Sequence, residues 1–313
     1  MNKRITVIGS YNTDLVSKAP HLPRPGETVL GGPFKMGPGG KGSNQAVCSA
    51  RLGAEVYFIG CVGNDNFGEM AKDFLLKENI KIDYLKVTDK THTGIALIIV
   101  DDKTGENMIV VAPGANMEVT IEQIKDLKDV IMNSDIILLQ LEIPIETVSY
   151  ILDLVSKKEK PLSILNPAPA RILDKDIIGK ADIVTPNRNE LEVITGIKIE
   201  TLEDVKKASR EVISYGVKGV IVTLGKDGAF VVWDREYKHV PSFKVEAVDT
   251  TGAGDAFNGG LAVALSEGKD LISSVIFANA VSGLSVTKMG AALSMPYREE
   301  VEKFLKNYNY EIM

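Results

Sequence analysis

The chain has 313 residues, of which 44% are hydrophobic and 25% charged, close to the composition of an ordinary globular protein. This composition argues against intrinsic disorder, a fibrous repeat and a disulfide scaffold, and the net charge of -6 argues against bulk nucleic acid or an anionic membrane as the partner. Glycine is in excess, at 28 residues where a usage of about 7% would give about 22.

The chain begins with a β-branched run, Arg4–Ser10, which predicts a first strand and is too short for the apolar region of a signal peptide. No apolar stretch approaches the roughly 18 residues of a membrane span. We therefore expect a cytoplasmic protein. Cys48 and Cys61 lie in apolar sequence and are expected to act as small buried hydrophobes.

Strand and helix patterns alternate along most of the chain. The predicted strands are 4–10, 56–60, 135–141, 162–165, 183–185, 219–224 and 243–248, and the predicted helices are 43–52, 68–79, 145–157 and 202–215. Short strands separated by helices indicate βαβ crossovers and a mostly parallel sheet. Three consecutive helices, 254–266, 271–287 and 297–307, are expected in the C-terminal third. We expect residues 1–313 to form a single α/β domain.

Two segments depart from this alternation. Residues 93–101 and 107–112 read as two strands joined by a turn that contains Gly105, which predicts a hairpin. The natural pairing partner is the proline-containing stretch of residues 14–36, with Thr28–Leu30 as its strand-like part. We therefore expect a small antiparallel sheet, formed by about 14–36 and 92–112, that serves as a lid or an interface.

The first glycine cluster, residues 37–42, opens a predicted helix. It fails the P-loop pattern, and its Gly37-x-Gly39-x-x-Gly42 spacing fits a dinucleotide fingerprint that should instead follow the first strand. A dinucleotide-dependent oxidoreductase therefore stays open as an alternative. Polar residues surround the cluster and would suit a polyhydroxyl ligand; these are Asn12, Asp14, Lys41, Asn44 and Gln45.

The second glycine cluster also leads into a predicted helix. The backbone N–H groups of Gly252, Ala253 and Gly254 could form an anion hole, favoured by the helix dipole. Asp255 follows directly and reads either as a helix N-terminal carboxylate or as a catalytic base. A carboxylate beside an anion hole is what phosphoryl transfer to a hydroxyl requires.

Together these segments resemble the two signatures of the PfkB carbohydrate kinase family, and of the ribokinases within it. The signature segments are 39–46 and 249–255, and further matching motifs lie at 12–14, 140–142, 166–169, 187–190, 223–228 and 278–280. The resemblance implies a three-layer α/β/α fold with an antiparallel β lid. It also implies ATP-dependent phosphorylation of D-ribose at O5, with Mg²⁺ and K⁺ as cofactors and a homodimer formed through the lid.

The resemblance also implies roles for individual residues. The sugar would be held by Asn12, Asp14, Gly40, Lys41, Gly42, Asn44 and Glu142, with Asp255 as the base and Gly252, Ala253 and Gly254 as the anion hole. ATP would be bound by Asn187, Thr223, Leu224, Gly225, Lys226, Asp227, Gly228, Gly254 and Asn279, and Glu190 would act indirectly on magnesium. A potassium site is implied at Asp249, Thr251, Ser285, Lys288, Gly290 and Ser294.

Other functions remain open at this stage. A relative with another acceptor, such as deoxyribose, fructose or a nucleoside, and a non-catalytic sugar-binding protein are both compatible with the fold. One residue departs from the ribokinase pattern: Ser43 stands where alanine is usual. A small residue is expected to be tolerated there.

Overall fold

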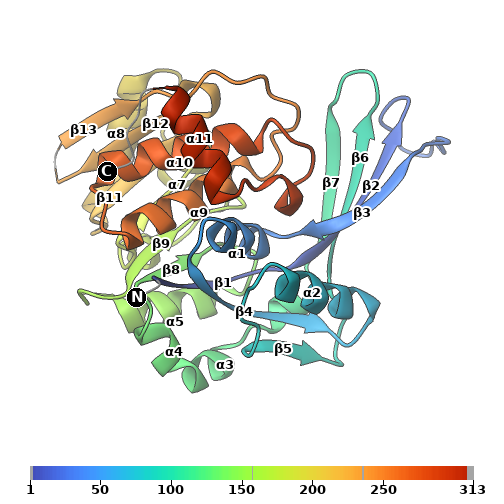
Figure 1. Ribbon diagram of the computed structural model, residues 1–313, viewed down its shortest axis with the longest axis horizontal. Helices are drawn as coiled ribbons and strands as arrows, with labels where there is room; N and C mark the ends of the chain where they lie inside the picture. Colours follow the sequence, from blue (N-terminus) through green and yellow to red (C-terminus); the bar gives the residue numbers. More distant parts are fainter. Residues whose placement is uncertain (1–2, 157, 235, 309–313) are drawn as a thin grey trace.

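The computed structural model describes residues 3–156, 158–234 and 236–308 and contains two sheets (Figure 1). The larger sheet has nine strands in the order β13-β12-β11-β10-β9-β8-β1-β4-β5. From β5 to β11 all neighbours are parallel, and β12 and β13 add an antiparallel edge. The strands are β1 Arg4–Ile8, β4 Glu55–Gly63, β5 Leu85–Thr88, β8 Ile136–Leu139, β9 Leu162–Leu165, β10 Ile183–Val184, β11 Gly219–Thr223, β12 Ala229–Trp233 and β13 Glu236–Val240.

Helices cover both faces of this sheet, because its strands are apolar on both sides. In β1, Ile5 and Val7 enter one core and Ile8 enters the other. The first core packs against α1 Lys41–Arg51, α2 Asn66–Lys77, α9 Ala253–Ser266, α10 Leu271–Ser285 and α11 Arg298–Asn307. The second packs against α3 Ile121–Asp126, α4 Lys128–Met132, α5 Ile145–Val155, α6 Lys175–Ile178, α7 Arg188–Thr195 and α8 Leu202–Ser214. The predicted three-layer fold with a mostly parallel sheet is confirmed.

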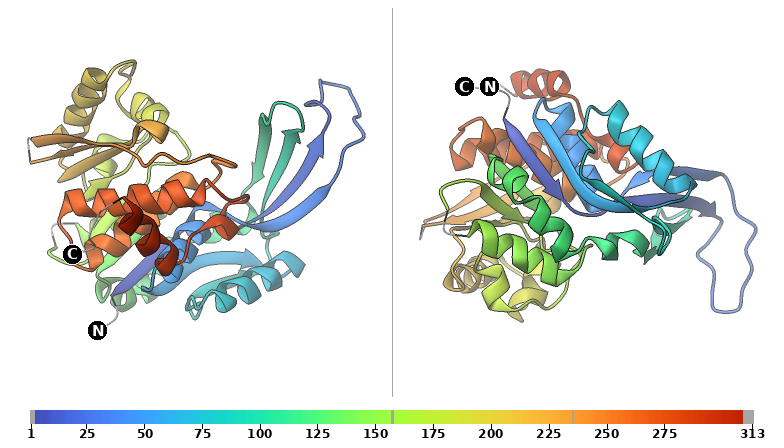
Figure 2. Two further views of the ribbon diagram at one scale, coloured as in Figure 1. Left: turned by 45° about the horizontal axis from the view of Figure 1, so that its top comes forward. Right: turned by 90° about the horizontal axis from the view of Figure 1, so that it is seen from below.

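The smaller sheet, called the lid here, projects to one side of the molecule (Figures 1 and 2). Its four strands are β2 Asn12–Ala19, β3 Phe34–Gly39, β6 Gly94–Asp101 and β7 Asn107–Ala112, in the order β3-β2-β6-β7. The two outer pairs are antiparallel, as predicted, but the central pair β2–β6 is parallel. That pairing joins distant segments, so a hairpin pattern cannot reveal it.

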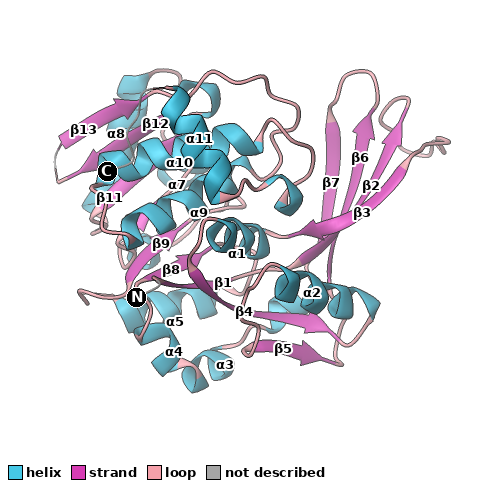
Figure 3. Cartoon of the chain, viewed as in Figure 1, coloured by secondary structure: helices cyan, strands magenta, loops and turns pink. Residues whose placement is uncertain are grey.

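Two predicted strands are wrong. Thr28–Leu30 lies in the loop between β2 and β3, and residues 243–248 lie in an extended segment outside the sheet (Figure 3). The Val248 and Asp249 N–H groups donate to the Val286 carbonyl in place of a strand neighbour. The sheet edge is instead formed by β12 and β13. That residues 1–313 form one domain with the lid stays a prediction.

Both cysteines are buried and unpaired, as expected from their apolar surroundings. Within the part of the chain that the structure describes, no helix is long and apolar enough to cross a membrane.

Candidate active site

The site begins where α1 presses against the turn that follows β1. A Cβ at Gly42 would lie 2.6 Å from the Ser10 nitrogen, so only glycine permits this approach. Gly40, directly before the helix, has φ +91°, a conformation that glycine adopts without steric cost. The first glycine cluster therefore brings the start of α1 to the carboxyl end of β1, and α/β folds place their ligands at the carboxyl ends of their strands.

Asp255 lies in the first turn of α9 and meets the start of α1. Its side chain is 5% exposed, and its two oxygens accept hydrogen bonds from Asn44 Nδ2 at 2.8 Å and Gln45 Nε2 at 3.0 Å. Burial raises the pKa of Asp255, and the charge of Lys41 and the two amide donors oppose that shift. The two glycine clusters, far apart in the sequence, thus form one site.

A second group of carboxylates lies on the lid side of Asp255. Glu142 Oε2 accepts from Ser10 Oγ at 2.5 Å and from the Lys41 backbone nitrogen at 3.0 Å. Burial, together with the charges of Glu142 and Asp255, raises the pKa of Asp14 to about 7. Burial alone would lower the pKa of Lys41, but the surrounding carboxylates raise it above its usual value. The group can therefore accept hydrogen bonds from several hydroxyls around one ammonium.

The lid supplies Asn12 and Asp14 at the root of β2. Asn12 is 3% exposed, and its Oδ1 accepts from Asn116 Nδ2 at 2.8 Å. Asn116 also bonds the backbone of Tyr11 on both sides, through Oδ1 and Nδ2. A Cβ at Gly39 would lie 2.2 Å from Asp14 Oδ1, so the two strands meet closely. These contacts fix the side chains at the base of the lid.

A cavity of about 220 Å³ opens beside Asp255. Gly252, at φ +78°, is the residue before α9, and a side chain at Gly254 would meet open space. The cavity is lined by Lys41, Asn166, Ala168, Thr185, Asn187, Glu190, Thr223, Thr250, Gly252, Ala253, Gly254, Asp255 and Asn258. A helix N-terminus facing a polar cavity favours an anionic ligand, and a buried carboxylate at its side can accept a proton.

The far wall of the cavity is formed by the start of α7 and the end of β11. Asn187 and Glu190 form a capping box: Asn187 Oδ1 accepts from the Glu190 nitrogen, and Glu190 Oε2 accepts from the Asn187 nitrogen, both at 2.8 Å. Asn187 also bridges to Thr223. Burial raises the pKa of Glu190. Glu190 therefore caps α7 and also lines the cavity.

The remaining nucleotide-site candidates lie next to this wall but do not line the cavity. They are Leu224, Gly225, Lys226, Asp227 and Gly228, which form the turn after β11, and Asn279 on α10. Gly228 has φ +91°, and a Cβ there would lie 2.1 Å from the Val240 carbonyl. Asn279 Nδ2 donates to the Val240 and Pro241 carbonyls at 3.3 and 3.2 Å. The chain after β13 therefore connects the two.

The predicted potassium residues lie in the loop before α9, at the end of α10 and in the segment that follows α10. The Asp249 carboxylate accepts from the Thr251 nitrogen, the Thr251 hydroxyl and the Gly290 nitrogen at 2.7 to 2.9 Å. Ser285 and Ser294 donate to backbone carbonyls of their own turns, and Lys288 Nζ turns away to Glu300 at 2.6 Å. Among the described residues no group of three or more His, Cys, Asp or Glu side chains is placed to hold a metal ion. A cation here would need backbone carbonyl and hydroxyl oxygens.

Sequence reasoning missed several residues of the site. Asn166, Thr185 and Asn258 line the cavity, Ser10 bonds Glu142, and Asn116 holds Asn12. Asn116 had no local signal, because it lies in a short turn far along the chain from Asn12. For Asn166, its place in the 166–169 motif was an available signal.

The structure also decides against the dinucleotide fingerprint. Gly37 and Gly39 lie in lid strand β3, so the fingerprint does not join a main-sheet strand to its helix.

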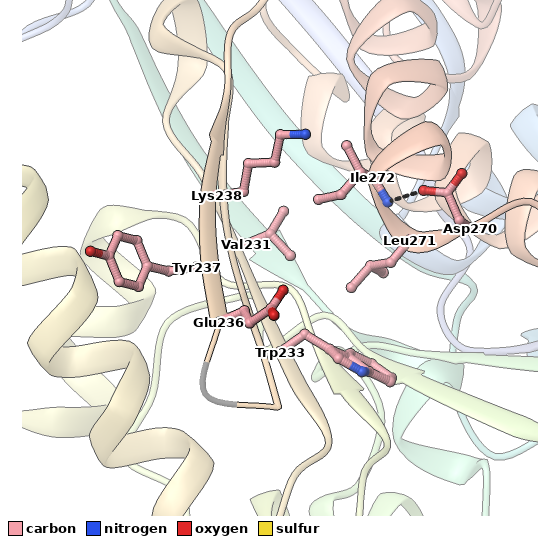
Figure 4. Close-up of a pocket in the computed structure, with 8 residues that line it drawn as sticks. All are labelled: Val231, Trp233, Glu236, Tyr237, Lys238, Asp270, Leu271 and Ile272. Carbon is pink, nitrogen blue, oxygen red and sulfur yellow. Dashed lines mark hydrogen bonds between the residues drawn. The ribbon is translucent and has the colours of Figure 1, made fainter.

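A second, larger cavity of about 350 Å³ lies between β12, β13 and the start of α10 (Figure 4). Trp233, Leu271 and Ile272 form its apolar part, and none of the predicted site residues lines it.

Comparison with known proteins gives consistent matches along the chain. The model of the pfkB family carbohydrate kinases matches residues 2–298. A Haemophilus influenzae ribokinase is 39% identical over 307 residues, covering 98% of this chain and 100% of the relative. A Salmonella typhi deoxyribokinase is 36% identical, covering 96% and 98%. The solved structure of Arabidopsis thaliana ribokinase complexed with ribose and ATP superposes with a TM-score of 0.89 at 33% identity, covering 98% and 99%.

Proposed function

The chain belongs to the pfkB family of carbohydrate kinases and is a ribokinase-like, ATP-dependent sugar kinase; we propose that its acceptor is D-ribose, phosphorylated at O5. The products would be D-ribose 5-phosphate and ADP. The observation that carries the proposal is the meeting of Asp255 with the amides of α1 at the mouth of a polar cavity. The ribose and ATP bound to the Arabidopsis relative support the choice of substrates.

We propose that the sugar lies between the lid and α1. Asn12, Asp14 and Glu142 would accept hydrogen bonds from its hydroxyl groups, and Lys41 would donate hydrogen bonds to its oxygens. Gly40 and Gly42 would contribute backbone groups that a side chain would block. The burial of Asn12 and Asn44 and the lack of a partner for Asn44 Oδ1 among the described residues support a ligand that brings its own hydrogen-bond donors.

For the chemical step we propose that Asp255 takes the proton of the ribose 5-hydroxyl. At the same time O5 of the ribose attacks the γ-phosphorus of ATP. The bond to the β,γ-bridging oxygen breaks, and ADP leaves with that electron pair. The N–H groups at residues 252–254, at the positive end of α9, would stabilise the charge on the transferring group. Lys41 lies on the same cavity and would balance the negative charge that gathers there.

ATP would occupy the cavity wall formed by Asn187 and Thr223 and extend along residues 224–228 towards Asn279. Magnesium, when bound, would neutralise phosphate oxygens. Glu190 fits an indirect role, because the capping box uses one of its oxygens while the residue also lines the cavity. We propose the potassium site at the loops of Asp249 and Gly290, whose oxygen donors suit a hard cation.

We also propose that the lid joins two copies of the chain. Met36, Leu15, Leu97 and Val110 occupy paired positions across all four lid strands and therefore share one face. Side chains alternate along β2, so this row lies on the face opposite to Asp14. Met36, Leu97 and Val110 are 45%, 50% and 65% exposed, which supports burial of the row against a second lid.

A coupled assay of ADP release tests the acceptor. Ribose, 2-deoxyribose, fructose and adenosine are compared at equal concentration with Mg-ATP, with and without potassium. We expect the highest kcat/KM with ribose and activation by potassium. The deoxyribokinase relative makes 2-deoxyribose the second candidate, and a higher kcat/KM with that sugar would replace ribose in the proposal.

A further inference from the structure

A chain of buried side-chain amides extends from Asp255 to the end of β8. Gln45 Nε2 donates to Asp255 Oδ1 at 3.0 Å, and Gln140 Nε2 donates to Gln45 Oε1 at 2.6 Å. Gln45 and Gln140 are both fully buried. Gln140 follows β8 directly and has no contact with the cavity that would hold ATP. The chain thus links the proposed base to a rigid strand of the main sheet.

The ionised carboxylate of Asp255 sets the direction of both hydrogen bonds in this series of amides, from Gln45 to Asp255 and from Gln140 to Gln45. A carboxylate only accepts, so Gln45 must turn its NH₂ group towards Asp255 and its oxygen towards Gln140. Gln140 must then present its own NH₂ group, because two facing oxygens would repel. The second hydrogen of Gln45 Nε2 points to Asn166 Oδ1 at 3.4 Å, so that amide group is fully used.

The far end of the chain shows what this direction costs. Gln140 Oε1 is buried and has no hydrogen-bond partner in the described part of the molecule. It faces Gly9, where a Cβ would lie 2.1 Å from it. An orphan buried acceptor is unfavourable, and turning the Gln140 amide over would place its oxygen against that of Gln45. The orphan oxygen is therefore the consequence of directing an NH₂ group at Gln45.

We infer that Gln45 and Gln140 are positioning residues for the base: Gln140 locks the amide of Gln45, and Gln45 fixes one oxygen of Asp255. Asn44 holds the other oxygen at 2.8 Å, so the carboxylate plane is fixed relative to the start of α9. The inference rests on the proposed role of Asp255. It adds two residues that make no contact with the nucleotide and that act on the protonation and orientation of the base.

The effect must be separated from the other groups that face Asp255. These are Lys41 on α1, Cys48 two turns further along α1, Asp14 on the lid, Glu142 after β8 and Glu190 on α7. Gln140→Leu changes none of these charges. It removes only the donor to Gln45, so that the amide of Gln45 can turn and its hydrogen bond to the charged base is weakened.

The test is ADP release with ribose from pH 5.5 to 9. For Gln140→Leu we expect kcat to fall about tenfold, since a hydrogen bond to a charged group is weakened. The KM for ribose should stay within about twofold, because no sugar-contacting group in the proposal changes. The acid limb of the kcat profile should move to higher pH, because an Asp255 that loses a donor binds its proton more tightly.

Gln140→Glu provides a second, sharper readout. When protonated, the acid donates its O–H to Gln45 Oε1 and replaces the native amide. When ionised, it accepts from the NH₂ group of Gln45 and turns the Gln45 oxygen towards Asp255. We therefore expect activity near that of the parent at low pH and a loss as pH rises, a basic limb that the parent lacks. This variant preserves size, so it serves if Gln140→Leu does not fold.

Gln123→Leu is the matched control. Gln123 Nε2 donates to the Gly60 and Tyr84 carbonyls, and its Oε1 is buried without a partner, but the residue lies away from the site. It should lower the melting temperature and leave the pH profile unchanged. An unshifted acid limb in Gln140→Leu, or a shift equal to that of Gln123→Leu, would overturn the inference. A parent protein that phosphorylates no sugar would instead overturn the proposed function.

Discussion

The unusual proton affinity of Asp14 makes a quantitative prediction about sugar binding. Burial and the charges of Glu142 and Asp255 raise the pKa of Asp14 to about 7, so this carboxyl is half protonated at neutral pH. If Asp14 accepts hydrogen bonds from the sugar hydroxyls, only its ionised form binds the sugar well. The apparent Kd for ribose is then the intrinsic Kd divided by the ionised fraction.

The magnitude follows from that pKa. The ionised fraction is about 0.9 at pH 8, about 0.5 at pH 7 and about 0.1 at pH 6. The apparent Kd for ribose should therefore rise about tenfold between pH 8 and pH 6. Binding should also release a proton, with the largest release below pH 7, since the sugar selects the ionised carboxyl.

Isothermal titration calorimetry with ribose and no ATP measures both quantities. Titrations in two buffers of different ionisation enthalpy give the number of protons released at each pH. In Asp14→Asn the affinity should be weaker and nearly independent of pH over this range. Glu142→Gln removes one of the two neighbouring charges and should move the transition to lower pH.

The reasoning would be refuted by a Kd that is constant between pH 6 and pH 8 in the parent protein. It would equally be refuted by an Asp14→Asn variant that keeps the full pH dependence. The second result would assign the titration to Asp255, whose pKa is also raised and which faces the same site.

Four further changes have expected results. Asp255→Asn should still bind ribose and ATP but lose about 100- to 10,000-fold in kcat for ADP release, and near-normal turnover would remove Asp255 from the role of base. Asp14→Asn should stabilise the protein at pH 8 by about 1–3 kcal/mol in urea unfolding. Because the folded pKa of Asp14 lies above its ordinary value, ionisation of this carboxyl lowers the free energy of unfolding as pH rises towards and through about 7. At pH 4.5 the folded carboxyl is still protonated, so an equal gain in Asp14→Asn at that pH would contradict the prediction. Gly42→Ala should cost about 1–3 kcal/mol by forcing α1 off the turn after β1, whereas Gly37→Ala, with nothing within 4 Å of its Cβ, should be near neutral. Sedimentation should give a dimer that Leu97→Lys combined with Val110→Lys dissociates, while Leu76→Lys, equally exposed on α2, leaves it intact.

The elements that the sequence predicted well are those whose signal is local. The helix predicted at 202–215 spans 202–214, and the strand predicted at 162–165 has those bounds, because apolar spacing and capping residues determine them. The edge hairpin β12–β13 was missed, and residues 243–248 were wrongly assigned to a strand. These segments are all short, and only the neighbour available for pairing decides which of them joins the sheet.

The site divides in the same way. Glycine-rich turns and Asp255 are visible in the sequence because a helix start is a local feature. Asn116 is not, because its importance depends on a partner about a hundred residues away, and the 140–142 motif marks Gln140 without showing that its partner is Gln45. An isolated asparagine or glutamine gives no sign of which amide it will meet. The raised pKa of Asp14 is equally invisible, since it arises from burial and from the charges of Glu142 and Asp255 on two other segments.

The lid strands begin at the residues proposed to hold the sugar. β2 starts at Asn12, β3 ends at Gly39 and β6 starts at Gly94, so the lid is joined to the site by its base and reaches outward for about 25 Å at its eight-residue strands. Any rotation of the lid would therefore pivot at the proposed binding site. A small rotation at Asn12 becomes a large displacement at the tip, and a force at the tip acts on the sugar contacts directly. If two lids pack against each other, a sugar bound to one subunit would change the position of the lid in the other.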